Sequence, residues 1–172
     1  MSNRKFSSKL VDGPHQAASR SMLRGVGLTD EDFKKPLVGI ASMGAQVTPC
    51  NMHINGLADI VNESLVNENL KGMLFNTITV SDGISMGTTG MKYSLVSREV
   101  IADSIETVVG CLGYDGVITI GGCDKNMPGA IIALARLNRP GIFIYGGSIR
   151  PSEQNTDYVT GCEKTGEFAK GS

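Results

Sequence analysis

Apolar positions along the chain fall into short continuous runs that alternate with longer amphipathic stretches. The short runs are rich in β-branched and aromatic residues and predict buried strands over 37–42, 74–80, 116–122 and 141–147. The longer stretches repeat apolar residues every three or four positions and predict helices over 53–69, 94–113 and 128–138. The pattern therefore predicts strands that alternate with helices.

Near-continuous apolar strands joined by helical crossovers predict a parallel sheet that is covered on both faces through right-handed connections. We expect an α/β fold with a doubly wound, mostly parallel sheet and helices on both faces. Residues 1–35 are interpreted as an amino-terminal arm that includes a short helix from Ala17 to Leu23. Residues 36–150 are interpreted as the α/β domain, and residues 151–172 as a polar, turn-rich tail or linker.

Composition places the chain among ordinary globular proteins. Of its 172 residues, 41% are hydrophobic and 19% are charged, so the chain is long enough and apolar enough for one folded domain. The formal net charge of -1 argues against binding to nucleic acid. No apolar run is long enough for a membrane span, and the first residues lack the apolar stretch of a signal peptide, so we expect a cytoplasmic protein.

The four cysteines are Cys50, Cys111, Cys123 and Cys162. In an intracellular chain we expect reduced thiols, metal ligands or catalytic groups rather than disulfides. Cys111 is interpreted as a small buried hydrophobic residue on the helix over 94–113, and Cys162 as a residue of the tail.

Reactive side chains gather just after the predicted strands. Cys50 follows the first strand, Asp82 follows the second, and Cys123, Asp124 and Lys125 follow the third. Ligands of open parallel sheets bind beyond the carboxyl ends of the strands, so these residues form a candidate site. Taken singly, each cysteine could be a packing residue and each aspartate a turn or cap, but their coincidence at one edge favours a metal site.

The residue types suggest two kinds of metal. A pair of thiolates suits a soft or redox metal, whereas carboxylates suit Mg²⁺ or a similar hard ion. Lys125 does not fit easily, because an ammonium group repels a dication. We therefore expect Lys125 to point away, or to lose its charge through a shifted pKa or carboxylation. His53 is interpreted as a helix cap or a packing residue.

Four blocks of sequence carry a resemblance to a known family: TPCNMHINGLA, VSDGISMGTTGMKYSLVSREVIADSIE, GCDKNMPGAIIALARLNRP and the GGSI turn at 146–149. With these blocks the chain resembles the dihydroxy-acid dehydratases, within the family that also contains the 6-phosphogluconate and sugar-acid dehydratases. The resemblance implies dehydration of a 2,3-dihydroxy acid to a 2-oxo acid in branched-chain amino acid synthesis, with an iron-sulfur cluster and Mg²⁺.

The resemblance also implies roles for individual residues. Cys50 and Cys123 resemble cluster ligands, while Asp82, Asp124 and a carboxylated Lys125 resemble Mg²⁺ ligands. The presence of Cys50 favours a [2Fe-2S] cluster over a [4Fe-4S] cluster. The third cluster cysteine, the serine base and a glutamate ligand of Mg²⁺ are expected beyond residue 172, and the family implies a homodimer.

Two alternatives stay open on the sequence. The first is a sugar-acid dehydratase of the same family that acts on an aldonate. The second is a non-catalytic, metal-binding remnant of a dehydratase.

Overall fold

A four-stranded parallel sheet forms the centre of the protein in a computed structural model that describes residues 3–171. The strands are β1 (Leu37–Ser42), β2 (Lys71–Asn76), β3 (Gly116–Gly121) and β4 (Gly141–Tyr145). The helices and helical turns are α1 (Ser8–Val11), η1 (Pro14–Gln16), α2 (Ala17–Gly25), η2 (Asp32–Lys34), α3 (Ile54–Asn67), α4 (Asp82–Ser85), η3 (Thr89–Met91), α5 (Lys92–Cys111), α6 (Asn126–Leu137) and α7 (Tyr158–Ala169).

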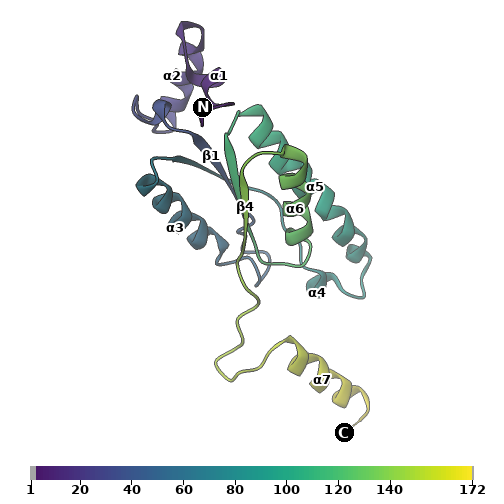
Figure 1. Cartoon of the computed structure of the whole chain (residues 1–172). Helices are drawn as coiled ribbons and strands as arrows, with labels where there is room; N and C mark the ends of the chain where they lie inside the picture. The colour runs from purple at the N-terminus through teal and green to yellow at the C-terminus, as the bar shows by residue number, and fades with distance from the viewer. Residues whose placement is uncertain (1–2, 172) are drawn as a thin grey trace.

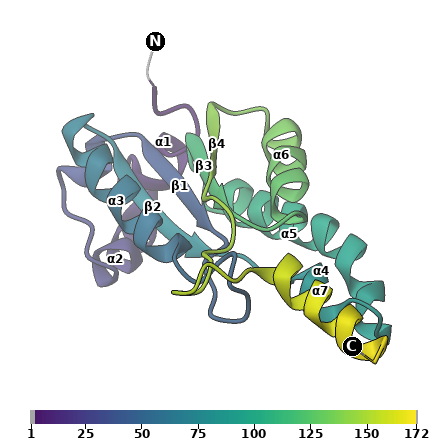
Figure 2. The ribbon, with the colours of Figure 1, turned by 90° about the horizontal axis from the view of Figure 1, so that it is seen from below.

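The strand order is β2-β1-β3-β4. The chain adds β2 on one side of β1, and then returns to add β3 and β4 on the other side. Helix α3 covers one face of the sheet, while α5 and α6 cover the other (Figures 1 and 2). The predicted doubly wound α/β fold with helices on both faces is confirmed. The crossover places a topological switch point between β1 and β3, at the carboxyl ends of the strands.

Two apolar clusters hold the layers together. Under α3, Val38, Ile40 and Ile120 pack against Ile54 and Ala58. On the other face, the buried residues include Leu37, Ala41, Val117, Ile101, Ile105, Val109, Ala130 and Ala133. Alternate residues of the central strands β1 and β3 thus point to opposite clusters, which is why these strands are apolar along their whole length.

The strand predictions need two corrections. Strand β2 begins at Lys71 and ends at Asn76, earlier than the predicted range 74–80, because its pairing with β1 starts at Leu37 and ends at Ser42. The prediction that all strands are buried is also wrong, since β2 and β4 are the edge strands and expose side chains such as Ile142.

The arm before β1 lies at the amino ends of the strands (Figure 1). The carboxylate of Asp115, just before β3, accepts hydrogen bonds from the backbone N–H groups of Phe6, Ser7 and Leu37 at 2.8, 3.0 and 3.1 Å. Phe33 is buried in the cluster beneath α5. The arm is therefore fastened to the end of the sheet opposite the candidate site.

The last segment contains a helix that the polar, turn-rich pattern did not predict. Asp157 caps α7 by accepting a hydrogen bond from Thr160 N at 2.9 Å. Figure 1 shows α7 at the end of an extended segment, away from the sheet. The division of the chain at residues 35 and 150 stays a prediction. Within residues 3–171, no helix has both the length and the apolar character that a membrane crossing requires.

Candidate metal-binding site

The loops after β1, β2 and β3 place all five predicted site residues beside one another at the carboxyl edge of the sheet. A cavity of about 420 Å³ lies there. Cys50, Asp82, Cys123 and Asp124 line it, together with the small or apolar residues Ser81, Gly83, Met86, Gly122, Met127, Tyr145, Ser148, Ile149 and Tyr158. The fifth residue, Lys125, reaches this group through its contacts with Asp82 and Asp124.

The two thiols of the site are buried and interact with each other. The exposed fraction is 9% for Cys50 and 5% for Cys123, and both cysteines are free. Burial, and then the nearby Cys50 thiol, raises the pKa of Cys123 to about 12. The Cys123 thiol also donates a hydrogen bond to Asp124 Oδ1 at 3.4 Å. Without a cation beside it, the Cys123 thiol therefore stays protonated at neutral pH.

The carboxylates of Asp82 and Asp124 converge on one positive charge. Lys125 Nζ lies 2.6 Å from Asp82 Oδ2 and 3.0 Å from Asp124 Oδ2. Ser94, from the first turns of α5, donates a hydrogen bond to the other oxygen of Asp82. No sequence pattern points to Ser94, because only the packing of α5 brings it to Asp82.

The charges of this group are fixed by their contacts. Burial opposes ionisation of Asp82, but hydrogen bonds from Lys125 and Ser94 lower its pKa below 3.8. Hydrogen bonds to Asp82 and Asp124 raise the pKa of Lys125 above 10.5. In this arrangement the ammonium group is the counterion of both carboxylates, and the expectation that Lys125 points away from a dication or loses its charge beside one stays a prediction.

Sequence reasoning missed a buried polar network beneath the thiols. Asn51 and Asn126 are both fully buried, and Asn51 Nδ2 donates to Asn126 Oδ1 at 2.7 Å. The same oxygen accepts the backbone N–H of Cys123 at 3.1 Å. Asn126 directly follows the Cys123-Asp124-Lys125 triplet in the sequence, but nothing in a single sequence distinguishes it from an exposed helix-starting asparagine.

The thiols and the carboxylates meet as two pairs. Within residues 3–171, no three or more His, Cys, Asp or Glu side chains come together in a group that could hold a metal ion. A metal ion bound by the two thiols, or by the two carboxylates, would therefore need further ligands, such as water or substrate.

Neither of the remaining cysteines lines the cavity. Cys111 is exposed, which contradicts its interpretation as a buried residue. It is the last residue of α5, and at 100° per residue it faces away from the buried Val109. Cys162 is exposed on α7.

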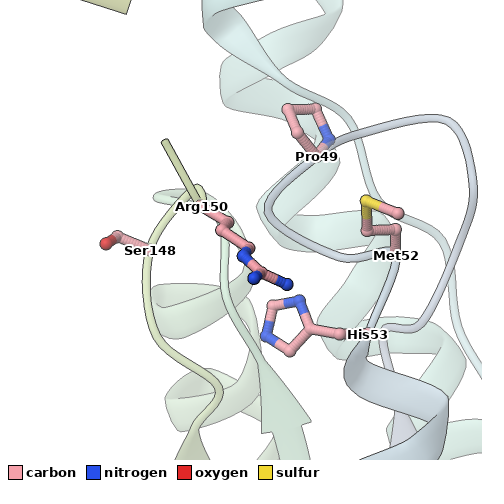
Figure 3. Close-up of a pocket in the computed structure, with 5 residues that line it drawn as sticks. All are labelled: Pro49, Met52, His53, Ser148 and Arg150. Atoms are coloured by element: carbon pink, nitrogen blue, oxygen red, sulfur yellow. The ribbon is translucent and has the colours of Figure 1, made fainter. Parts of the chain in front are cut away.

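A second hollow, of about 380 Å³, lies between the segments that follow β1 and β4 (Figure 3). Pro49, Met52, His53, Ser148 and Arg150 line it, and Ser148 also lines the first cavity. His53 precedes α3 but forms no side-chain cap, and its Nε2 atom lies 2.7 Å from the carbonyl oxygen of Gly146. This contact links the segments after β1 and β4.

Comparison with known proteins identifies the family. The family model for the amino-terminal part of dihydroxy-acid/6-phosphogluconate dehydratases matches residues 35–172. The chain belongs to this family. A dihydroxy-acid dehydratase of Vesicomyosocius okutanii is 64% identical over 166 residues, which cover 96% of this chain and 30% of that protein. Dihydroxy-acid dehydratase 2 of Acinetobacter baylyi is 62% identical over 168 residues, which cover 98% of this chain and 30% of the relative.

Membership of the dihydroxy-acid/6-phosphogluconate dehydratase family confirms the resemblance drawn from the four sequence blocks. The family is generally metal-dependent. The chain spans about 30% of the length of the curated relatives that it matches. The matched region begins just before β1 and contains every residue of the candidate site.

Proposed function

We propose that this chain supplies the metal-binding part of a hydro-lyase that converts 2,3-dihydroxy acids, such as 2,3-dihydroxy-3-methylbutanoate, to 2-oxo acids. The activity serves valine, isoleucine and leucine biosynthesis in the cytoplasm, in a homodimer. The single observation that carries the proposal is the convergence of a thiol pair and a carboxylate pair on one cavity of about 420 Å³.

The thiol pair fits an iron-sulfur cluster. Cys50 and Cys123 come from different loops, are buried, and lie close enough for the Cys50 thiol to raise the pKa of Cys123, a proximity that suits two ligands of one soft metal centre. Their protons must leave before they can bind iron, and a nearby metal lowers a thiol pKa strongly enough to remove them. We favour a [2Fe-2S] cluster on Cys50 and Cys123, with further ligation from outside this pair.

The carboxylate pair fits Mg²⁺. Asp82 and Asp124 already converge on the ammonium group of Lys125, which marks the place where the two carboxylates favour a cation. Lys125 becomes compatible with Mg²⁺ when its amine is carboxylated, because the resulting carbamate is an anionic oxygen ligand. The raised pKa of Lys125 makes the neutral amine scarce, so the contacts with Asp82 and Asp124 oppose carboxylation while no metal is bound.

When bound, the cluster and Mg²⁺ would act as Lewis acids that favour departure of the 3-hydroxyl group and acidify the C2 proton. The residues of this chain would hold and orient these groups. Ser94 fixes one oxygen of Asp82 through its hydrogen bond, and the other oxygen accepts the hydrogen bond from Lys125. Tyr145 and Ile149, which are both exposed, line the cavity beside these groups.

Anaerobic reconstitution of the complete protein with iron and sulfide tests the proposal. We expect visible absorption of a cluster, bound iron, and 2-oxo acid formation from 2,3-dihydroxy-3-methylbutanoate once Mg²⁺ is added. Cys50→Ser and Cys123→Ser should each abolish iron retention, while the matched control Cys111→Ser, at an exposed cysteine, should retain it.

A substrate panel then separates the alternatives. Turnover of an aldonate in preference to a dihydroxy acid would replace the proposed substrate with a sugar acid. A bound cluster without turnover of any acid would favour a non-catalytic, metal-binding protein. Absence of both cluster and Mg²⁺ binding would refute the proposal.

A further inference from the structure

Three loops that follow three different strands meet at one buried side chain, Asn126. Its Oδ1 atom accepts hydrogen bonds from Cys123 N at 3.1 Å and from Asn51 Nδ2 at 2.7 Å. Its Nδ2 atom donates to Thr79 Oγ1 at 3.0 Å. Asn126 thereby joins the loop after β3 to the loops after β1 and β2.

Asn51 extends this junction into the loop that carries Cys50. Its Nδ2 atom also donates to the carbonyl oxygen of Met43 at 2.7 Å, and its Oδ1 atom accepts a hydrogen bond from Thr48 Oγ1 at 2.8 Å. Asn51 is thus bonded to the start of the loop after β1, at Met43, and to its middle, at Thr48, and it is the residue next to Cys50. Its position fixes where that cysteine enters the cavity.

The local geometry of Cys123 is fixed in the same way. The backbone N–H of Asn126 donates to the carbonyl oxygen of Cys123 at 2.9 Å, while the side chain of Asn126 accepts the N–H of Cys123. This reciprocal pair closes the turn that displays the Cys123 thiol. Both asparagines are fully buried, so water does not compete for their hydrogen bonds.

We infer that Asn51 and Asn126 are positioning residues that set the separation and orientation of the Cys50 and Cys123 thiols for a soft metal centre. The inference rests on the proposed function of the thiol pair. A metal centre requires its ligands at fixed distances, and residues behind the ligands that orient them affect metal affinity by about 10- to 100-fold. Asn51 and Asn126 lie behind both thiols in this way. Neither asparagine is among the residues that line the cavity.

Titration of the complete, metal-free protein with Cd²⁺ tests the inference, because Cd²⁺ bound to thiolates gives a charge-transfer absorption independent of turnover. Asn126→Ala should weaken Cd²⁺ binding about tenfold or more. Thr79→Val is a milder variant that keeps the side-chain shape and removes the acceptor of Asn126 Nδ2, and we expect a smaller loss in the same direction.

A control must separate positioning from general stability. Val109→Ala truncates a fully buried residue of α5 at the other end of the sheet, so it lowers the unfolding midpoint without touching the thiol loops. We expect Val109→Ala to bind Cd²⁺ as the unvaried protein does. In the iron-reconstituted protein, Asn126→Ala and Thr79→Val should release iron to a chelator faster than Val109→Ala.

Two results would overturn the inference alone: unchanged Cd²⁺ affinity in both Asn126→Ala and Thr79→Val, or an equal loss of affinity in Val109→Ala. A different result bears on the proposed function. If the charge-transfer band of the unvaried protein persists in the Cys50→Ser, Cys123→Ser double variant, the thiol pair is not the soft-metal site, and both proposals fail.

Discussion

The ammonium nitrogen of Lys125 lies 2.6 Å from the carboxylate of Asp82, although 43 positions of sequence separate the two residues. The exposed fraction is 19% for the Lys125 side chain and 14% for the Asp82 side chain, so water screens the ion pair little. Asp124 binds the same nitrogen, which makes Lys125 the balancing charge for two carboxylates at the mouth of the cavity.

Removal of that charge should destabilise the metal-free protein. We expect Lys125→Met to lower the free energy of unfolding by about 1–3 kcal/mol near neutral pH, since two neighbouring carboxylates lose their shared counterion. Urea unfolding measures the loss. The matched control is Lys34→Met, at the exposed ion pair with Glu31, where we expect a change within about 0.5 kcal/mol.

The contribution of Lys125 should also depend on pH in a defined direction. Its pKa is raised above 10.5 by the hydrogen bonds to Asp82 and Asp124, so its stabilisation is fully present below that value and is lost as the pH rises through the folded-state pKa. Stability profiles of the unvaried protein and Lys125→Met should therefore converge at alkaline pH. Parallel profiles across this range would contradict the assignment.

Asp32 offers a similar test at acidic pH, away from the site. Burial opposes its ionisation, but hydrogen bonds from Thr29 and Lys35 lower its pKa from 3.8 to about 2. Its stabilisation is present above pH 3.8 and is lost as the pH falls through about 2. Asp32→Asn should cost about 2 kcal/mol near neutral pH and much less in acid.

The neighbouring Asp30 supplies the control for Asp32. Asp30 pairs with Arg24 at the surface, where its side chain is 77% exposed. Asp30→Asn should change the free energy of unfolding by less than about 0.5 kcal/mol at either pH. An equal effect at both aspartates would show that the contacts of Asp32 do not set its pKa.

Reactivity of the cysteines should follow their burial. In the metal-free protein, the exposed Cys111 and Cys162 should react with a thiol reagent first. Cys123 should react far more slowly near neutral pH, because it is buried and its pKa is raised to about 12, so very little thiolate is present. Mass spectrometry of the labelled peptides gives the order, and fast labelling of Cys123 would contradict the packing of the thiol pair.

Gly122 should not tolerate a side chain. A Cβ atom there would lie 2.4 Å from the carbonyl oxygen of Cys50, so Gly122→Ala should push the two cysteine loops apart. We expect a loss of about 1–3 kcal/mol in stability, together with weaker binding of Cd²⁺ or iron. The control is Gly56→Ala in the first turn of α3, where no atom lies within 4 Å of the added methyl group and the helix should gain slight stability.

The hydrophobic pattern determined the fold class, since strands that are buried on both faces must be apolar throughout and helices that cover a sheet must be apolar on one side only. It predicted β1 without error and the three helices α3, α5 and α6 to within two residues at each end. It misplaced β2, because the pairing of Lys71 and Gly72 with β1 depends on the partner strand and not on local hydrophobicity. It also missed α7, which contains two glycines, residues that are unfavourable within a helix.

The sequence by itself also determined which residues gather at the site, because the carboxyl ends of parallel strands lie at one edge of the sheet, and Cys50, Asp82 and Cys123 follow three of them. Only the tertiary structure decided how these groups are charged and held. The Asn51–Asn126 bond and the Ser94–Asp82 bond join residues that are distant in sequence, and such contacts depend on packing that no local pattern encodes. The causes of the pKa shifts exist only in the folded chain: burial raises the pKa of Cys123, while the hydrogen bond between Lys125 and Asp82 raises the pKa of Lys125 and lowers that of Asp82.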